Sequence, residues 1–288
     1  MKLASFERPD GTPGWGVVKE DGIVDLADLA PSLRLALADG VPLAAAADRP
    51  ADYAIDDVRF LPAIPDPEKI LCLGLNYATH IREAGRELPA RPVLFVRFAN
   101  SQIGHNNAMI RPNASDNFDF EGELAIVIGK RCRHVRREDA ASVVAGYSCY
   151  NDGSIRDWQR HSIQFTAGKN FPATGGFGPW VVTADEIDDI TAATLVTRLN
   201  GEEMQRATLG DLVFDIPAII EYCSTFTELA PGDVILTGTT GGVGFARTPP
   251  IWMKPGDVVE VEIEGIGILR NTIEQEGEQQ GTQGETDG

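Results

Sequence analysis

The chain has 288 residues and carries 43 acidic against 25 basic side chains, which gives a formal net charge of −18 at pH 7. The length allows one large domain, or a large domain with a small one, around a substantial core. The negative charge argues against nucleic acid and against an anionic membrane surface as partners, because both need a basic surface.

The first residues mix charged and apolar side chains, so they do not resemble a signal peptide. No apolar run approaches the roughly 18 residues that a membrane span needs. The four cysteines are widely spaced and form no Cys-x-x-Cys pair, which favours reduced, buried thiols. We therefore expect a cytoplasmic protein without a membrane segment.

Residues 1–65 are expected to form a small α+β domain. Short strands are predicted in "KLASFE" and "GWGVVKEDGIVDL" on either side of a Pro-Asp-Gly-Thr-Pro turn, and a helix follows at 33–48. The three prolines of "PAIPDPEK" (62–69) indicate a stiff linker and a domain boundary.

Residues 66–274 are expected to form a β-rich catalytic domain. Strands are predicted in "KILCLGL", "PVLFVRF", "ELAIVIG", "PWVVT", "LVTRLNG", "DVILTG" and "VVEVEIEGIGILRNTI". Helices are expected only around 76–85, 136–145 and 215–226, the last opened by Asp215 with Pro217 in its first turn. This pattern predicts an α+β fold with a closed or sandwich-like body. The polar segment 275–288 is expected to be a disordered tail.

A stretch of alternating carboxylates leads into the run "LAIVI". In an extended strand, Asp119, Glu121 and Glu123 point to one face, and Phe118, Phe120 and Leu124 point to the other. Like charges this close need neutralisation, and a divalent cation would supply it; a solvated strand face is the alternative.

Asp152 adds a third carboxylate after another apolar segment, although it could be an ordinary turn residue. Glu121, Glu123 and Asp152 together offer three hard oxygen ligands, the number used by Mg²⁺ or Mn²⁺ when water and substrate complete the coordination.

His80 and Glu83 lie three residues apart in "LGLNYATHIREAG". On a helix they share one face, so the carboxylate could orient the imidazole as a general base; an ordinary surface pair is the alternative. Lys169 precedes a Gly-rich loop and either reaches a buried anion or points to solvent. The turn in "VILTGTTGGVGF" could bind a carboxylate through its amides.

The order of these motifs resembles the fumarylacetoacetate hydrolase family, which includes acylpyruvases and related hydratases and decarboxylases of aromatic catabolism. The motifs that carry the resemblance are "GLNYATHIREAG", "FDFEGELAIVIG", "NDGSIRDWQ", "GK" with a later "GPW", "LTGTTGGVG" and "KPGDVVEVEIEGIGILRN". They span residues 69–274. The resemblance implies a mixed β-sandwich roll, a small N-terminal domain and a homodimer.

The resemblance also implies roles for individual residues. It implies metal ligands for Mg²⁺ or Mn²⁺ (Glu121, Glu123 and Asp152), a catalytic dyad on a lid helix (His80 and Glu83), an active-site lysine (Lys169) and substrate-binding residues (Tyr77, Arg156, Gln159 and Thr239). The chain departs from the family pattern at Pro172, where an Asp is usual, and at Thr240, where a Pro is usual. His161 could also approach the substrate.

The expected partner is a small 2-oxo acid. The leading hypothesis is a metal-dependent hydrolase that cleaves a C–C bond in an acylpyruvate or another 2,4-dioxo acid and releases pyruvate and a second acid. The alternatives are an oxaloacetate decarboxylase, a hydratase or isomerase of a 2-oxo-ene-dioic acid, and a homologue that binds metal without catalysis.

Overall fold

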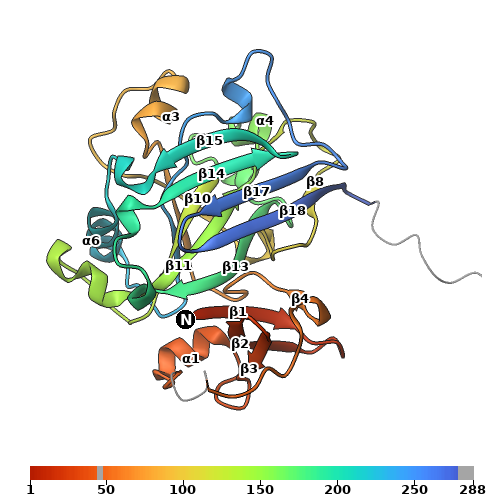
Figure 1. Cartoon of the computed structure of the whole chain (residues 1–288). Helices are drawn as coiled ribbons and strands as arrows, with labels where there is room; N and C mark the ends of the chain where they lie inside the picture. The colour runs from red at the N-terminus through yellow and green to blue at the C-terminus, as the bar shows by residue number, and fades with distance from the viewer. Residues whose placement is uncertain (44–47, 278–288) are drawn as a thin grey trace, which may run out of the picture.

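The computed structural model describes residues 1–43 and 48–277. Two β-sheets form the body, and the N-terminal segment packs at one end of it (Figure 1). Helices are few and short, so the predicted α+β, β-rich class is confirmed.

The larger sheet has eleven strands. In spatial order its main path is β3 (Gly22–Asp25), β2 (Pro13–Lys19), β1 (Lys2–Glu7), β13 (Gly175–Thr183), β11 (Val144–Asp152), β10 (Gly122–Ile128), β16 (Val234–Leu236), β5 (Ile70–Gly74) and β6 (Val93–Arg97). Two short strands lie off this path: β4 (Arg59–Phe60) pairs with β1, and β7 (Gln102–Ile103) pairs with β13.

A five-stranded sheet packs in front of the strands β10, β11 and β13 (Figure 1). Its order is β15 (Glu202–Thr208), β14 (Thr194–Leu199), β17 (Val258–Ile263), β18 (Gly267–Gln275) and β8 (Met109–Arg111). A separate pair joins β9 (Phe118–Asp119) to β12 (Ser154–Ile155).

The N-terminal strands continue the large sheet of the body. Lys2 and Leu3 of β1 pair with Val182 and Val181 of β13. The proline-rich segment 62–69 is anchored to the same sheet, since the Ala63 amide donates to the Phe177 carbonyl. The division into domains at residues 65 and 66 stays a prediction.

Five α-helices lie in the described ranges: α1 (Leu33–Asp39), α3 (Ala78–Glu83), α4 (Arg156–Gln159), α5 (Thr166–Lys169) and α6 (Ile216–Phe226). The prediction for α6 is confirmed, and the Asp215 side chain caps it by accepting from the Ala218 amide. The helix predicted at 33–48 ends early, because Gly40 adopts a left-handed conformation with φ of 61°. Residues 44–47 of that prediction lie outside the described residues. Residues 137–143 form a 3₁₀ helix instead of the α-helix predicted at 136–145.

Strand β10 runs through the centre of the large sheet, between β11 and β16. Its side chains from Leu124 to Ile128 are completely buried, which explains the uninterrupted apolar run in the sequence. The same strand carries Glu123, and Glu121 lies just before its first residue. Both carboxyl groups are therefore buried next to the apolar core.

The C-terminal strand β18 extends to Gln275, which pairs with Arg111 of β8. The predicted tail therefore begins later than residue 275, and residues 278–288 lie outside the described residues. All four cysteines are free, as expected. No helix in the described residues combines the length and the apolar character that crossing a membrane requires.

Candidate metal centre and its cavity

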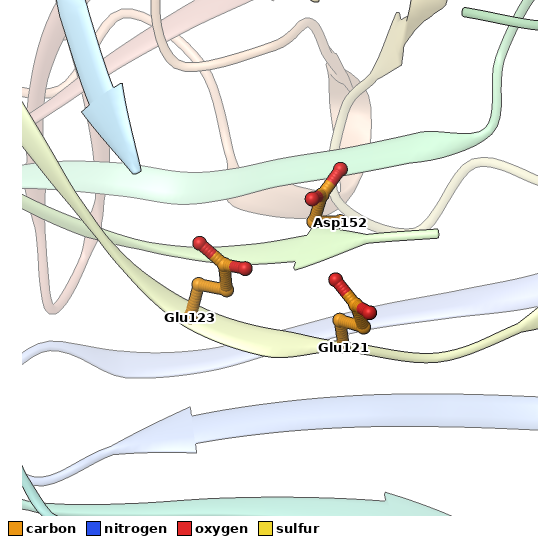
Figure 2. A group of neighbouring side chains, drawn as sticks. All are labelled: Glu121, Glu123 and Asp152. Carbon is orange, nitrogen blue, oxygen red and sulfur yellow. The ribbon is translucent and has the colours of Figure 1, made fainter. Parts of the chain in front are cut away.

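Three carboxylates converge where β10 begins and β11 ends. Glu121, Glu123 and Asp152 each offer an oxygen, and these oxygens lie within 4.8 Å of one another. Figure 2 shows the three carboxyl groups gathered in one place, two from one strand segment and one from its neighbour. The Asp152 amide donates to the Glu121 carbonyl at 2.8 Å, which fixes the register that brings the acids together. The predicted grouping of these acids is present.

Two of the predicted residues supply positive charge to this cluster. The Lys169 ammonium lies 2.6 Å from Glu121 Oε2 and 2.6 Å from Asp152 Oδ2. The Arg156 guanidinium lies 2.6 Å from Glu121 Oε1. Both cations are buried, so the alternative of a solvent-facing Lys169 is wrong.

Arg97 is a third buried cation, and the sequence reasoning missed it. Its Nη1 donates to Asp152 Oδ1 at 2.5 Å and to the Gly153 carbonyl at 3.1 Å. Its remaining donors reach Ser101 and Thr174. The available signal was a lone arginine inside the apolar segment "PVLFVRF". Neither Arg97 nor Asp152 is among the residues that line the cavity.

The buried cations affect the two glutamates differently, and the pKa values of Glu121 and Glu123 shift in opposite directions. Burial would raise the pKa of Glu121, but Arg156 and Lys169 hold it well below its ordinary value. Burial and the neighbouring Asp152 raise the pKa of Glu123 well above its ordinary value. Glu123 accepts a hydrogen bond from the Gly238 amide and forms no ion pair in the described residues. This donor set, with one buried carboxylate lacking a cation, fits Mg²⁺ or Mn²⁺.

Asp119 is not one of the three grouped acids, but it and Glu121 are paired with the same cation, Arg156. Asp119 ends β9, whereas Glu123 belongs to β10, and the chain leaves regular strand geometry between them. Its carboxylate accepts from Arg156 Nε at 2.8 Å and from the amides of Gly244 and Phe245. Asp119 therefore anchors Arg156 to the loop after β16.

His80 faces the cavity from helix α3. Its Nδ1 is buried and has no hydrogen-bond partner among the described residues. Burial lowers the pKa of His80 to about 4, so the imidazole is neutral near pH 7. The ring lies edge-on to Phe245 with 6.3 Å between centroids.

Glu83 does not contact His80 in the structure, contrary to the expected dyad geometry. Its carboxylate oxygens accept from the Gly242 amide at 2.9 and 3.0 Å. The Thr79 hydroxyl reinforces the same attachment, because it lies 3.2 Å from Thr240 Oγ1 and accepts from the Gly241 amide. Both residues thus fasten α3 to the Gly/Thr turn. The catalytic roles of His80 and Glu83 stay predictions.

The remaining predicted residues lie at different distances from the cavity. Thr239 and Gln159 line it; Thr239 Oγ1 donates to the Gly122 carbonyl, and Gln159 accepts from Arg156 Nη1. Tyr77 is buried but is not among the lining residues, and its hydroxyl has no partner among the described groups. Pro172 removes a carboxylate near Lys169, whose ion pairs come from Glu121 and Asp152 instead.

The cavity has a volume of about 570 Å³. Its polar lining comprises Glu121, Glu123, Lys169, Arg156, Gln159, Thr239 and His80, together with Arg86, Arg160, His161 and Ser162. Its apolar lining includes Leu73, Leu75, Phe95, Ile163, Phe165 and Phe245. Acidic and basic groups therefore face one pocket of the size that holds a small organic acid.

Known proteins resemble this chain over nearly its full length. Residues 69–274 match the family model described as "Fumarylacetoacetate (FAA) hydrolase C-terminal". A mitochondrial oxaloacetate tautomerase of Xenopus laevis is 37% identical over 287 residues, covering 95% of this chain and 90% of that protein.

Solved structures agree with this match. A 5-carboxymethyl-2-hydroxymuconate delta-isomerase from Mycobacterium smegmatis is 33% identical, with a TM-score of 0.78 over 96% of this chain and 100% of that one. A maleylpyruvate hydrolase from Sphingobium sp. SYK-6, solved with manganese(II) and pyruvate, is 30% identical, with a TM-score of 0.80 over 96% and 99% of the two chains.

Proposed function

The chain belongs to the fumarylacetoacetate hydrolase family, and we propose that it is a divalent-cation-dependent tautomerase of a 2-oxo acid such as oxaloacetate. The observation that carries this proposal is the pairing of two features in one cavity. The acids Glu121, Glu123 and Asp152 form a hard-oxygen donor set, and the neutral imidazole of His80 lines the cavity that Glu121 and Glu123 also line.

Keto–enol interconversion requires one proton to leave carbon 3 and one to reach the keto oxygen. The C–H electron pair becomes the C2–C3 double bond, so the molecule is isomerised without a change in composition. A bound Mg²⁺ or Mn²⁺ would supply Lewis-acid stabilisation of the negative charge that develops on the keto oxygen, worth several kcal/mol.

His80 is the side chain we assign to proton transfer. A neutral imidazole accepts a proton from carbon, and the Nδ1 atom has no competing partner among the described residues. Lys169 is unsuited to this role. Although burial opposes its charge, Asp152 and Glu121 raise its pKa, so it stays a cation that stabilises developing negative charge.

Arg156 is the side chain we assign to the substrate carboxylate. Its Nε and Nη1 are used by Asp119, Glu121 and Gln159, whereas its buried Nη2 has no partner among the described residues. An unsatisfied buried donor beside the cavity would be satisfied by a carboxylate oxygen.

Hydrolysis of an acylpyruvate is the second candidate, supported by the maleylpyruvate hydrolase structure with manganese and pyruvate. In that reaction water adds to the distal carbonyl carbon, and the C–C bond breaks to give pyruvate and a second acid. His80 would take the proton from water with Glu83 as its partner. This contact requires Glu83 to leave the Gly242 amide.

A direct comparison of substrates tests these alternatives. We expect the purified enzyme with Mg²⁺ or Mn²⁺ to accelerate decay of the oxaloacetate enol absorbance, and EDTA to abolish this activity. Pyruvate release from acylpyruvates, and carbon dioxide and pyruvate release from oxaloacetate, measure hydrolysis and decarboxylation in the same preparation. Cleavage of acylpyruvate without tautomerisation would reject the leading proposal in favour of the second.

A homodimer is part of the proposal, as is a cytoplasmic location with a role in aromatic catabolism. Sedimentation equilibrium should give twice the chain mass of 31.1 kDa.

A further inference from the structure

The cavity carries two arginines that the metal centre does not use. Arg86 follows helix α3, and Arg160 caps the C-terminus of helix α4. Both line the cavity together with Glu121 and Glu123. Two carboxylates and two additional positive charges therefore line the cavity, and the two arginines come from separate segments of the chain.

Neither guanidinium is neutralised by the protein. In the part of the chain that the structure describes, Arg86 and Arg160 form no ion pair and no side-chain hydrogen bond. Glu83, the nearest acid of α3 in sequence, is engaged by the Gly242 amide. Asp157, three residues before Arg160, accepts from the Ser115 hydroxyl. Both arginines are exposed, so water solvates them, and their guanidinium N–H groups are available to an anion that enters the cavity.

Two of the cavity's arginines, Arg156 and Arg160, lie over the aromatic ring of Phe245. Arg156 Cζ lies 4.5 Å from its ring centroid, and Arg160 Cζ lies 5.5 Å from it. Arg156 also bonds to Glu121 of the acidic cluster. Arg160 contacts the same ring but forms no ion pair with these acids, so its guanidinium is not committed to the acidic cluster. Stacking on a ring leaves guanidinium N–H groups available for a planar carboxylate.

We propose that Arg86 and Arg160 form a subsite for the second carboxylate of a dicarboxylic 2-oxo acid. This inference rests on the proposed function, because it assumes that the 2-oxo acid group occupies the end of the cavity with Glu121 and Glu123. The subsite selects substrates that carry a negative charge at the far end. A monocarboxylic 2-oxo acid leaves both guanidinium groups unpaired and gains nothing from them.

Substitution of each arginine by methionine tests the subsite, because methionine keeps much of the apolar stem and removes the charge. The substrates are oxaloacetate and phenylpyruvate, which undergo the same tautomerisation but differ in the second carboxylate. We expect Arg86→Met and Arg160→Met each to lower the ratio of kcat/KM for oxaloacetate to that for phenylpyruvate by about 10-fold or more, chiefly through KM. Arg160→Lys should restore part of the ratio.

Arg82→Met is the matched control, because Arg82 is an exposed arginine of α3 that bonds to the Ala78 carbonyl and does not line the cavity. It should keep the wild-type ratio. An unchanged ratio in both Arg86→Met and Arg160→Met overturns the subsite and leaves the proposed function standing.

A binding measurement separates failure of the subsite from failure of the proposed function. The probes are 3,3-difluorooxaloacetate, which cannot enolise, and pyruvate, both titrated calorimetrically with Mg²⁺ present. Preference for the dicarboxylate that both methionine variants reduce supports the subsite, even if the enzyme lacks tautomerase activity. Equal affinity for the two probes in the wild-type protein overturns it.

Discussion

Arg97 and Asp152 form a charged hydrogen bond of 2.5 Å in which neither side chain is exposed to solvent. Lys169 bonds to the other carboxylate oxygen of Asp152, so two cations fix this acid in place. Partners of this kind orient ligating side chains and set metal affinity. All three nitrogens of the Arg97 guanidinium donate hydrogen bonds, to Ser101, Asp152 and Thr174.

Arg97→Lys should therefore weaken Mg²⁺ or Mn²⁺ binding by about 10–100-fold, because lysine keeps the charge but loses the fork of donors. Isothermal titration of the folded protein measures this affinity. Arg131→Lys is the control, since its ion pair with Glu228 lies on the surface. Wild-type affinity in Arg97→Lys, combined with tighter binding in Arg97→Met, would mean that Arg97 acts only through its charge.

Glu123→Gln should have opposite effects without and with metal. The raised pKa of Glu123 means that the fold disfavours its ionised form, so the neutral amide should stabilise the metal-free protein at pH 7 by about 1 kcal/mol. The amide oxygen can still accept from the Gly238 amide. The stabilisation by added Mn²⁺, about 2.7 kcal/mol at 100 times Kd for the wild type, should largely disappear. Thermal unfolding with and without Mn²⁺ checks both effects, and a metal-free variant less stable than the wild type would contradict this account.

Glu83→Gln separates the two candidate reactions. The amide oxygen still accepts from Gly242, so helix α3 should keep its attachment, but the side chain no longer supplies a negative charge to His80. We expect tautomerisation to persist within a few-fold and any acylpyruvate hydrolysis to fall by 10²-fold or more. Hydrogen exchange over residues 78–83 verifies the attachment. Equal loss of both activities with unchanged exchange would place Glu83 in a step that both reactions share.

His105 should make stability depend on pH in mildly acidic solution. Burial, together with the nearby charge of Arg270, lowers its pKa to about 4. Its Nδ1 accepts from the Arg270 amide, which requires the neutral ring. Between about pH 6.5 and 4 the unfolded chain binds a proton that the folded chain does not, so the free energy of unfolding falls as the pH falls.

His105→Asn removes this titration while keeping an acceptor. The slope of the unfolding free energy against pH should decrease by up to about 1.4 kcal/mol per unit in that window, measured by urea unfolding. Identical slopes for the variant and the wild type would show that His105 does not titrate differently on folding.

The sequence predicted those strands and helices that are determined by neighbouring residues. The apolar run of β10 and the Asp215 cap with Pro217 of α6 are examples. Glu121 and Glu123 were found because alternate residues of an extended segment share a face. Asp119 was not expected to hold Arg156, and this contact depends on Arg156 of helix α4, which is distant in the sequence.

The parts that sequence reasoning missed depend on tertiary contacts. Arg97 reaches Asp152 only because β6 and β11, four strands apart in the sheet order, lie on either side of the site. Glu83 bonds to Gly242, which is distant in the sequence, so the spacing of His80 and Glu83 on one helix could not reveal its actual partner.

The central claim is that Glu121, Glu123 and Asp152 hold one divalent cation. Anomalous diffraction from crystals grown with Mn²⁺ tests it most directly. The account predicts one strong manganese peak in contact with oxygens of all three side chains. No anomalous peak at these carboxylates, with the Lys169 ammonium still bonded between Glu121 and Asp152 at saturating Mn²⁺, would contradict it.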